Sequence, residues 1–148
     1  SGNMRGVITR EEFAQVMVAY YESKTGQEID PVGQYFADTD NQEVLKAAAL
    51  GIITGYEDGT YRPDNPITRQ DIAVVIGRTL QKVDPTLSLS YSPVAIENGI
   101  SAYAYDSMMF LVHNGILKGD ETNNLNPLEH TTREQAVLLT TRAYEYFQ

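Results

Sequence analysis

An internal repeat is the feature that most constrains the fold of this chain. The triplet Ile-Thr-Arg stands at residues 8–10 and 67–69, and a variant, Thr-Thr-Arg, stands at 131–133. The second and third copies are offset by 64 residues (69 to 133), and the match continues backwards without a gap. The matching pairs are 51–55 with 115–119, and Pro63 with Pro127. Self-similarity at a fixed offset indicates one supersecondary unit used several times.

A long helix is expected after each triplet. Apolar residues follow at the spacing i, i+3, i+4, i+7 and i+8, so each helix should bury one face. The three stripes are Phe13, Val16, Met17, Tyr20 and Tyr21; Ile72, Val75, Ile76, Thr79 and Leu80; and Ala136, Leu139, Thr140, Ala143 and Tyr144. Thr9, Thr68 and Thr132 are the predicted N-caps. Glu12 and Gln135, three residues after Thr9 and Thr132, predict capping boxes, with Asp71 as a shorter substitute.

A shorter helix is expected before each loop. Val44, Ala47 and Ala48 align with Met108, Leu111 and Val112. We expect this helix to end at Gly51 and Gly115, because glycine readily adopts the left-handed conformation that ends helices. In copy two, Asp40 and Glu43 predict a capping box at its start.

The loop between the two helices carries a strong turn signal. In copy two, Asp58-Gly59 predicts a tight turn, with a very short hairpin as an option. Copy three has Thr122-Asn123 at this place, which predicts that the turn is lost there.

The repeats divide the chain into three unequal units. Residues 1–30 are the C-terminal half of a first repeat, 31–83 a second repeat, and 84–148 a third that includes a linker over 84–100. Because the first copy lacks its short helix, we expect an exposed apolar flank that could drive self-association.

Composition excludes several functional classes. The net charge of −9 disfavours nucleic acid and anionic membrane surfaces, which need clustered Lys and Arg. No stretch reaches the roughly 18 to 20 apolar residues of a membrane span, and no signal peptide is expected at the start. The absence of cysteine excludes disulfides, thiolate metal sites and a cysteine nucleophile.

The recurrent arginines are the first binding candidates. Arg10, Arg69 and Arg133 each open a helix, where a cation opposes the helix dipole at a cost of ~0.3 to 1 kcal/mol. Helix stability therefore does not explain them. Two explanations stay open: an ion pair with a neighbouring unit or packing of the aliphatic stem, or a guanidinium that faces an anionic ligand.

Tyrosines are the second group of candidates. Tyr56 and Tyr103 are candidate ligand contacts, with Tyr91 and Tyr105 as weaker ones. Tyr61 aligns with Leu125, so we expect it to be an apolar anchor under the loop.

No motif predicts a metal site or an active site. Asp38, Asp40 and Glu43 lack the glycine that an EF-hand needs, so capping is expected of them rather than calcium binding. His113 and His130 have no partner at ligand spacing, and no Ser-His-Asp set or phosphate loop is present. We therefore expect no catalysis, metal or cofactor.

Several segments resemble the S-layer homology domain family. The resemblance rests on Phe36-Ala37-Asp38, Gly51-Ile52-Ile53, the loop 55–63, the segment 67–71, and Tyr103-Ala104-Tyr105-Asp106 in copy three. It covers the chain as about two and a half units. It implies a mostly α fold in which helix-loop-helix repeats pack around a pseudo-threefold axis.

The resemblance also implies a function. Such modules anchor bacterial surface proteins to secondary cell-wall polysaccharide, often pyruvylated, so it implies an extracellular, cell-wall location. The grooves lie between adjacent units, which implicates Arg10, Arg69 and Arg133, with Asp58 and Gly59 shaping the best-preserved loop. The chain has no Trp and an eroded third copy, so the alternative is a structural or protein-interaction module that has lost glycan binding.

Overall fold

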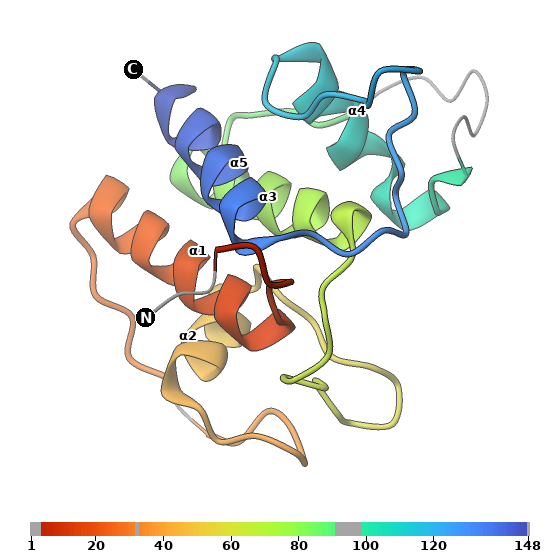
Figure 1. Ribbon diagram of the computed structural model, residues 1–148. Coiled ribbons are helices and arrows are strands. Elements are labelled where there is room, and N and C mark those ends of the chain that lie inside the picture. The colour runs from red at the N-terminus through yellow and green to blue at the C-terminus, as the bar shows by residue number, and fades with distance from the viewer. Residues whose placement is uncertain (1–3, 32, 91–98, 148) are drawn as a thin grey trace.

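The computed structural model describes residues 4–31, 33–90 and 99–147 (Figure 1). Helices and connecting loops make up these residues, and no strand is formed within them. The helices are α1 (Arg10–Thr25), α2 (Gln42–Leu50), α3 (Arg69–Val83), the 3-10 helix η2 (Ala102–Ala104), α4 (Tyr105–His113) and α5 (Arg133–Glu145). The predicted mostly α fold class is confirmed.

The long helices α1, α3 and α5 begin where the caps predict. The side chains of Thr9, Thr68 and Thr132 each accept a hydrogen bond from the backbone N–H three residues on. Full capping boxes form in copies one and three. These bonds satisfy N–H groups that an isolated helix start leaves without partners.

The predicted capping box at Asp40 and Glu43 is wrong. Asn41 caps α2, and its side-chain oxygen accepts from the N–H groups of Glu43 and Val44 at 3.0 and 3.1 Å. The helix therefore starts one residue later than expected, because asparagine makes an N-cap as good as aspartate.

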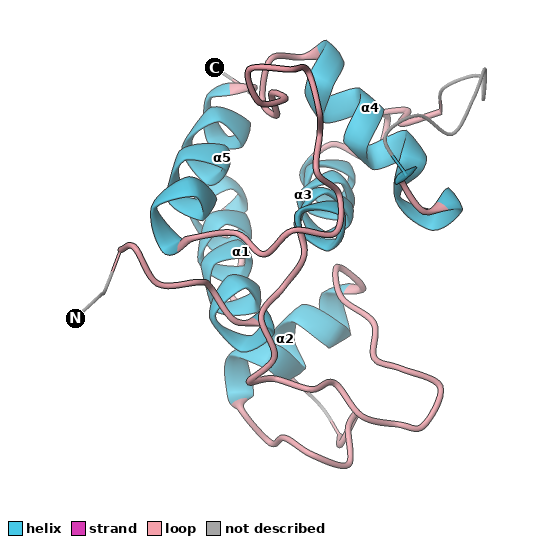
Figure 2. Cartoon of the chain, turned by 45° about the vertical axis from the view of Figure 1, so that its right-hand side comes forward, coloured by secondary structure: helices cyan, strands magenta, loops and turns pink. Residues whose placement is uncertain are grey.

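The starts of the three long helices are tied together in a ring. The first helical N–H of α1 donates to Asn65 O, that of α3 to Glu129 O, and that of α5 to Gly6 O, each at 2.9 Å. These three acceptors are equivalent under the repeat offsets. Each helix start is thus held by the loop of the next unit, and the start of α5 in the third unit is held by the first. The three units are therefore arranged with pseudo-threefold symmetry. The approach loops meet near the centre of the molecule (Figure 2).

The core lies between the long helices and on the buried faces of the short ones. α2 packs against α1, and α4 packs in the same way against α3. The predicted stripes are confirmed: copy two is buried throughout, and Val16, Thr140 and Tyr144 are half-buried. Tyr61 is fully buried under its loop, as predicted.

The position two residues before each long helix is apolar in two copies and polar in the third. Ile8 and Ile67 are buried there, and the third copy has Thr131, which is also fully buried. Its Oγ1 has no hydrogen-bond partner among the residues that the structure describes. A buried hydroxyl without a partner loses its hydration and gains nothing in return.

Replacing Thr131 by valine should therefore raise the free energy of unfolding by about 1 kcal/mol, because the shape is kept and the unpaired hydroxyl is removed. Urea denaturation measures the change. Thr140→Val is the matched control: Thr140 Oγ1 donates to Ala136 O at 2.8 Å, so this variant should not gain stability. A loss of stability in Thr131→Val would contradict the interpretation.

Candidate functional site

Two equivalent hollows lie beside the starts of α1 and α3. The first, of about 250 Å³, is lined among others by Arg10, Tyr56, Tyr61, Asp71, Arg78 and Tyr103. The second, of about 390 Å³, is lined among others by Arg69, Lys118, Gly119, Asp120, Glu129 and Gln135. Each holds a helix-start arginine, the loop of the next unit and the third residue of the next long helix. The repeat therefore builds the same kind of site twice.

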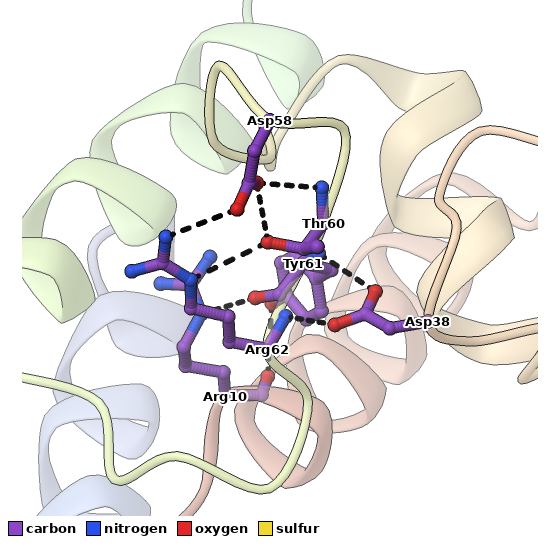
Figure 3. A network of polar contacts seen from close by, with 6 residues as sticks. All are labelled: Arg10, Asp38, Asp58, Thr60, Tyr61 and Arg62. Carbon is purple, nitrogen blue, oxygen red and sulfur yellow. Dashed lines mark hydrogen bonds and ion pairs between the residues drawn. The ribbon is translucent and has the colours of Figure 1, made fainter.

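Arg10 is held from several sides in the first hollow. Its side chain is buried, with the residue only 8% exposed, and its Nε donates to Tyr61 O at 2.8 Å (Figure 3). The guanidinium carbon lies 4.4 Å from the Tyr61 ring centroid and 4.9 Å from that of Tyr56. One terminal nitrogen lies 3.8 Å from Asp71 Oδ2. These contacts fix the direction of a group that still lines the hollow with N–H donors.

The loop beside Arg10 is a tight turn built by Asp58 and Gly59. Tyr56 N–H donates to Thr60 O at 2.8 Å, and Gly59 N–H donates to Tyr56 O at 3.0 Å. Gly59 has φ +83°, and the Asp58 carboxylate accepts from Thr60 N–H and from its hydroxyl. The predicted turn is confirmed, without strands on either side of it.

The third copy keeps the same turn, so the predicted loss of that turn is wrong. Asp120 N–H donates to Asn124 O, and Asn123 N–H donates to Asp120 O, both at 2.9 Å. Asn123 takes φ +63° in the place of Gly59. Asparagine tolerates the left-handed region better than most residues, and this compensates for the missing glycine.

Sequence reasoning missed Arg62 and gave Asp38 the wrong role. The Asp38 carboxylate accepts from Tyr61 N–H at 2.9 Å and from Arg62 N–H at 2.8 Å, so it fixes the loop rather than capping a helix (Figure 3). Arg62, at φ +58°, then places its guanidinium carbon 3.7 Å from the Tyr56 ring centroid. Tyr56 therefore has both Arg10 and Arg62 against its ring.

Tyr103 forms another side of the first hollow. Its hydroxyl donates to Asp71 Oδ1 at 2.6 Å and accepts from Gln70 Nε2 at 3.1 Å. Burial of the hydroxyl, together with the Asp71 bond, raises the pKa of Tyr103 to about 12. The residue is nonetheless 63% exposed, so its anchored ring offers a free face. Tyr105 lies half-buried on α4, and Tyr91 falls outside the described residues.

Arg69 and Arg133 differ in what they contact. Arg69 Nε donates to Leu125 O at 2.9 Å, the equivalent of the Arg10 bond to Tyr61 O. Arg133 instead places Nε and a terminal nitrogen on the Glu12 carboxylate at 3.1 and 3.0 Å. Arg10 and Arg133 therefore pair with a neighbouring unit, as the first explanation expects. Arg10 and Arg69 also line hollows, and the ligand-facing role of these arginines stays a prediction.

The carboxylates of Asp38, Asp58 and Asp120 make the stability of the fold depend on pH in the acid range. Hydrogen bonds lower the pKa of three carboxyl groups. The chief donor is Tyr61 N–H for Asp38, the Thr60 hydroxyl for Asp58, and the Thr122 hydroxyl for Asp120. A carboxyl whose folded pKa lies below its unfolded value of about 3.9 stabilises the fold above that pH. That contribution is lost as the pH falls towards the folded pKa.

The free energy of unfolding should therefore fall as the pH drops below about 4, towards the folded pKa values of these carboxyls. Asp120→Asn and Thr122→Val should both flatten this dependence, since one removes the titrating group and the other its strongest donor. Urea denaturation at a series of pH values measures the slope. A wild-type slope in both variants would contradict this assignment.

The residues that the structure describes contain neither a metal-ligating cluster nor a helix that could span a membrane. In 4–31, 33–90 and 99–147, no group of three or more His, Cys, Asp or Glu side chains is placed to hold a metal ion. No helix within these ranges is long and apolar enough to cross a membrane.

Comparison with known proteins identifies the family. The S-layer homology domain model matches residues 38–73 and 98–137, about half of the chain. Cell surface glycoprotein 1 of Acetivibrio thermocellus is 37% identical over 90 residues, covering 51% of this chain and 4% of that protein. Amylopullulanase of Thermoanaerobacterium thermosulfurigenes is 35% identical over 107 residues, covering 70% of this chain and 5% of that protein. The chain thus spans only a small part of these relatives. It belongs to the S-layer homology domain family and is a cell-surface anchoring module.

Proposed function

We propose that this module binds an anionic secondary cell-wall polysaccharide, one that carries pyruvate ketals, in the hollow around Arg10. The observation that carries the proposal is the oriented guanidinium of Arg10 between Tyr56, Tyr61 and Asp71. A guanidinium can hold a carboxylate with two parallel hydrogen bonds, and partial burial strengthens such bonds.

The walls of the hollow suit a sugar. Tyr56 and Tyr103 expose aromatic surface beside Arg10, and such faces accept the apolar C–H side of a sugar ring. Arg62 lies outside this lining, with its guanidinium against the Tyr56 ring and one terminal nitrogen 3.5 Å from Asp58 Oδ2. The proposed role needs binding and orientation only, with no bond made or broken.

The Arg69 hollow is proposed as the weaker site. Asp120 stands where the first hollow has Tyr56, so an aromatic face is replaced by a negative charge. Arg133, with two nitrogens on Glu12, is proposed as a structural residue. The order of contribution to binding is then Arg10, Arg69, Arg133.

Co-sedimentation with purified bacterial wall sacculi tests the proposal. The chain should pellet with sacculi that carry the pyruvylated polysaccharide and stay in solution after the polysaccharide has been extracted. Pelleting that is unchanged after extraction would contradict it.

One observation favours the alternative of a protein-interaction module. Val137 and Leu138 on α5 are 48% and 47% exposed, whereas their equivalents Ala73 and Val74 on α3 are buried. An exposed apolar face of this kind commonly marks an interaction surface. Light scattering distinguishes the two proposals: a dimer that ignores wall polysaccharide supports the alternative, and a monomer that binds it supports the first.

A further inference from the structure

Arg78 is a cation on α3 for which the described residues supply no hydrogen-bond or ion-pair partner. Its side chain is half-buried, yet it makes no hydrogen bond or ion pair with any described residue. Arg142 occupies the same place in the third copy and donates to Ile116 O at 3.3 Å. In the third copy this arginine thus has a structural bond, and in the second copy Arg78 has no such bond to the described residues.

Arg78 lines three hollows, and two of them also share Tyr103. One of these two is the Arg10 hollow, and the other, of about 470 Å³, lies further along α3. Val74 and Tyr103 also line both. The two hollows are therefore neighbours that share Val74, Arg78 and Tyr103 as walls.

The second hollow is lined mainly by polar groups. They are Arg78, Gln81, Ser88, Ser90, Asp106 and Ser107. Hydroxyl, amide and carboxylate groups can both donate to and accept from the hydroxyls of a sugar. The exposed ring of Tyr103 stands between this lining and Arg10.

We propose that the binding groove continues from Arg10 across Tyr103 and Arg78 into this second hollow, and that the module holds more than one consecutive sugar. Arg78 binds an anionic substituent or a ring oxygen of the sugar that follows the one at Arg10. This inference rests on the proposed function, since it extends the same site. The module then selects a polysaccharide by the length of the bound segment as well as by its charge.

The test compares fragments of one purified pyruvylated wall polysaccharide. A fragment with a single pyruvylated sugar and a fragment several sugars longer are titrated calorimetrically into the wild type, Arg78→Gln and Arg142→Gln. Arg142→Gln removes the same charge at the equivalent position outside both hollows. Thermal unfolding of each variant confirms that it is folded.

The wild type should bind the longer fragment more tightly than the short one. Arg78→Gln should lose about tenfold in affinity for the longer fragment, the effect of one charge-assisted hydrogen bond. Its loss for the short fragment should be clearly smaller, although Arg78 also lines the Arg10 hollow. Arg142→Gln should match the wild type with both. Equal affinities of the wild type for the two fragments, or an unchanged Arg78→Gln, would overturn the extension while leaving the Arg10 site in place. No binding of either fragment by the wild type would overturn the proposed function itself.

Discussion

Replacing Arg10 by glutamine should lower the affinity for pyruvylated wall polysaccharide at least about 30-fold. Removing one member of a desolvated charge pair in a binding site costs about 2 kcal/mol or more, and each 1.4 kcal/mol is tenfold in affinity. Glutamine keeps part of the stem and a donor to Tyr61 O, but it cannot fork onto a carboxylate. Calorimetric titration measures the loss.

Arg133→Gln is the matched control for this prediction. It removes the same side chain at the same place in the third copy, where the guanidinium already lies on Glu12. Binding should survive within about twofold, because a cation outside the site acts only through a screened field. A large loss of affinity in Arg133→Gln, with Arg10→Gln unaffected, would reverse the assignment of the site.

Gly55→Ala should be among the most destabilising single substitutions in the loop, at about 3 kcal/mol. A Cβ at residue 55 would lie 2.6 Å from Thr60 O and 2.6 Å from Phe36 Cε1. The Thr60 carbonyl cannot move without breaking its bond to Tyr56 N–H, which closes the turn. The same substitution should therefore also weaken polysaccharide binding.

Gly59→Ala separates crowding from backbone strain. A Cβ there meets nothing within 4 Å, so its cost is that of φ +83°, about 1 kcal/mol. Urea denaturation of both variants gives the comparison. A smaller loss of stability in Gly55→Ala than in Gly59→Ala would contradict the packing described around the turn.

Local pattern predicts most of the helical structure of this chain. The threonine caps and the buried stripes depend on residues three or four apart, and they form where the sequence places them. The cap of α2 lies one residue later than predicted, because Asp40 and Asn41 both satisfy the same rule and the structure uses Asn41. The turn of the third copy was missed because Asn123 can take a glycine conformation.

The site depends on contacts that local pattern cannot give. The repeat indicates that Arg10, Arg69 and Arg133 are equivalent, yet only the ring of backbone bonds places Arg10 beside the loop of the second unit. The Glu12 that binds Arg133 is 121 residues away in the chain. Arg78 follows Arg69 at the same spacing as Arg142 follows Arg133, so the repeat itself marks Arg78 and Arg142 as equivalent. That Arg78 differs from Arg142 in having no partner among the described residues is visible only in three dimensions.

Calorimetric titration with one purified polysaccharide, before and after chemical removal of its pyruvate ketals, tests the central claim most directly. The claim is that a carboxylate on the glycan is held by the guanidinium of Arg10. The expected result is measurable binding that is lost when the ketal is removed. Equal binding of the two polymers, or no binding by a chain shown to be folded, would contradict it.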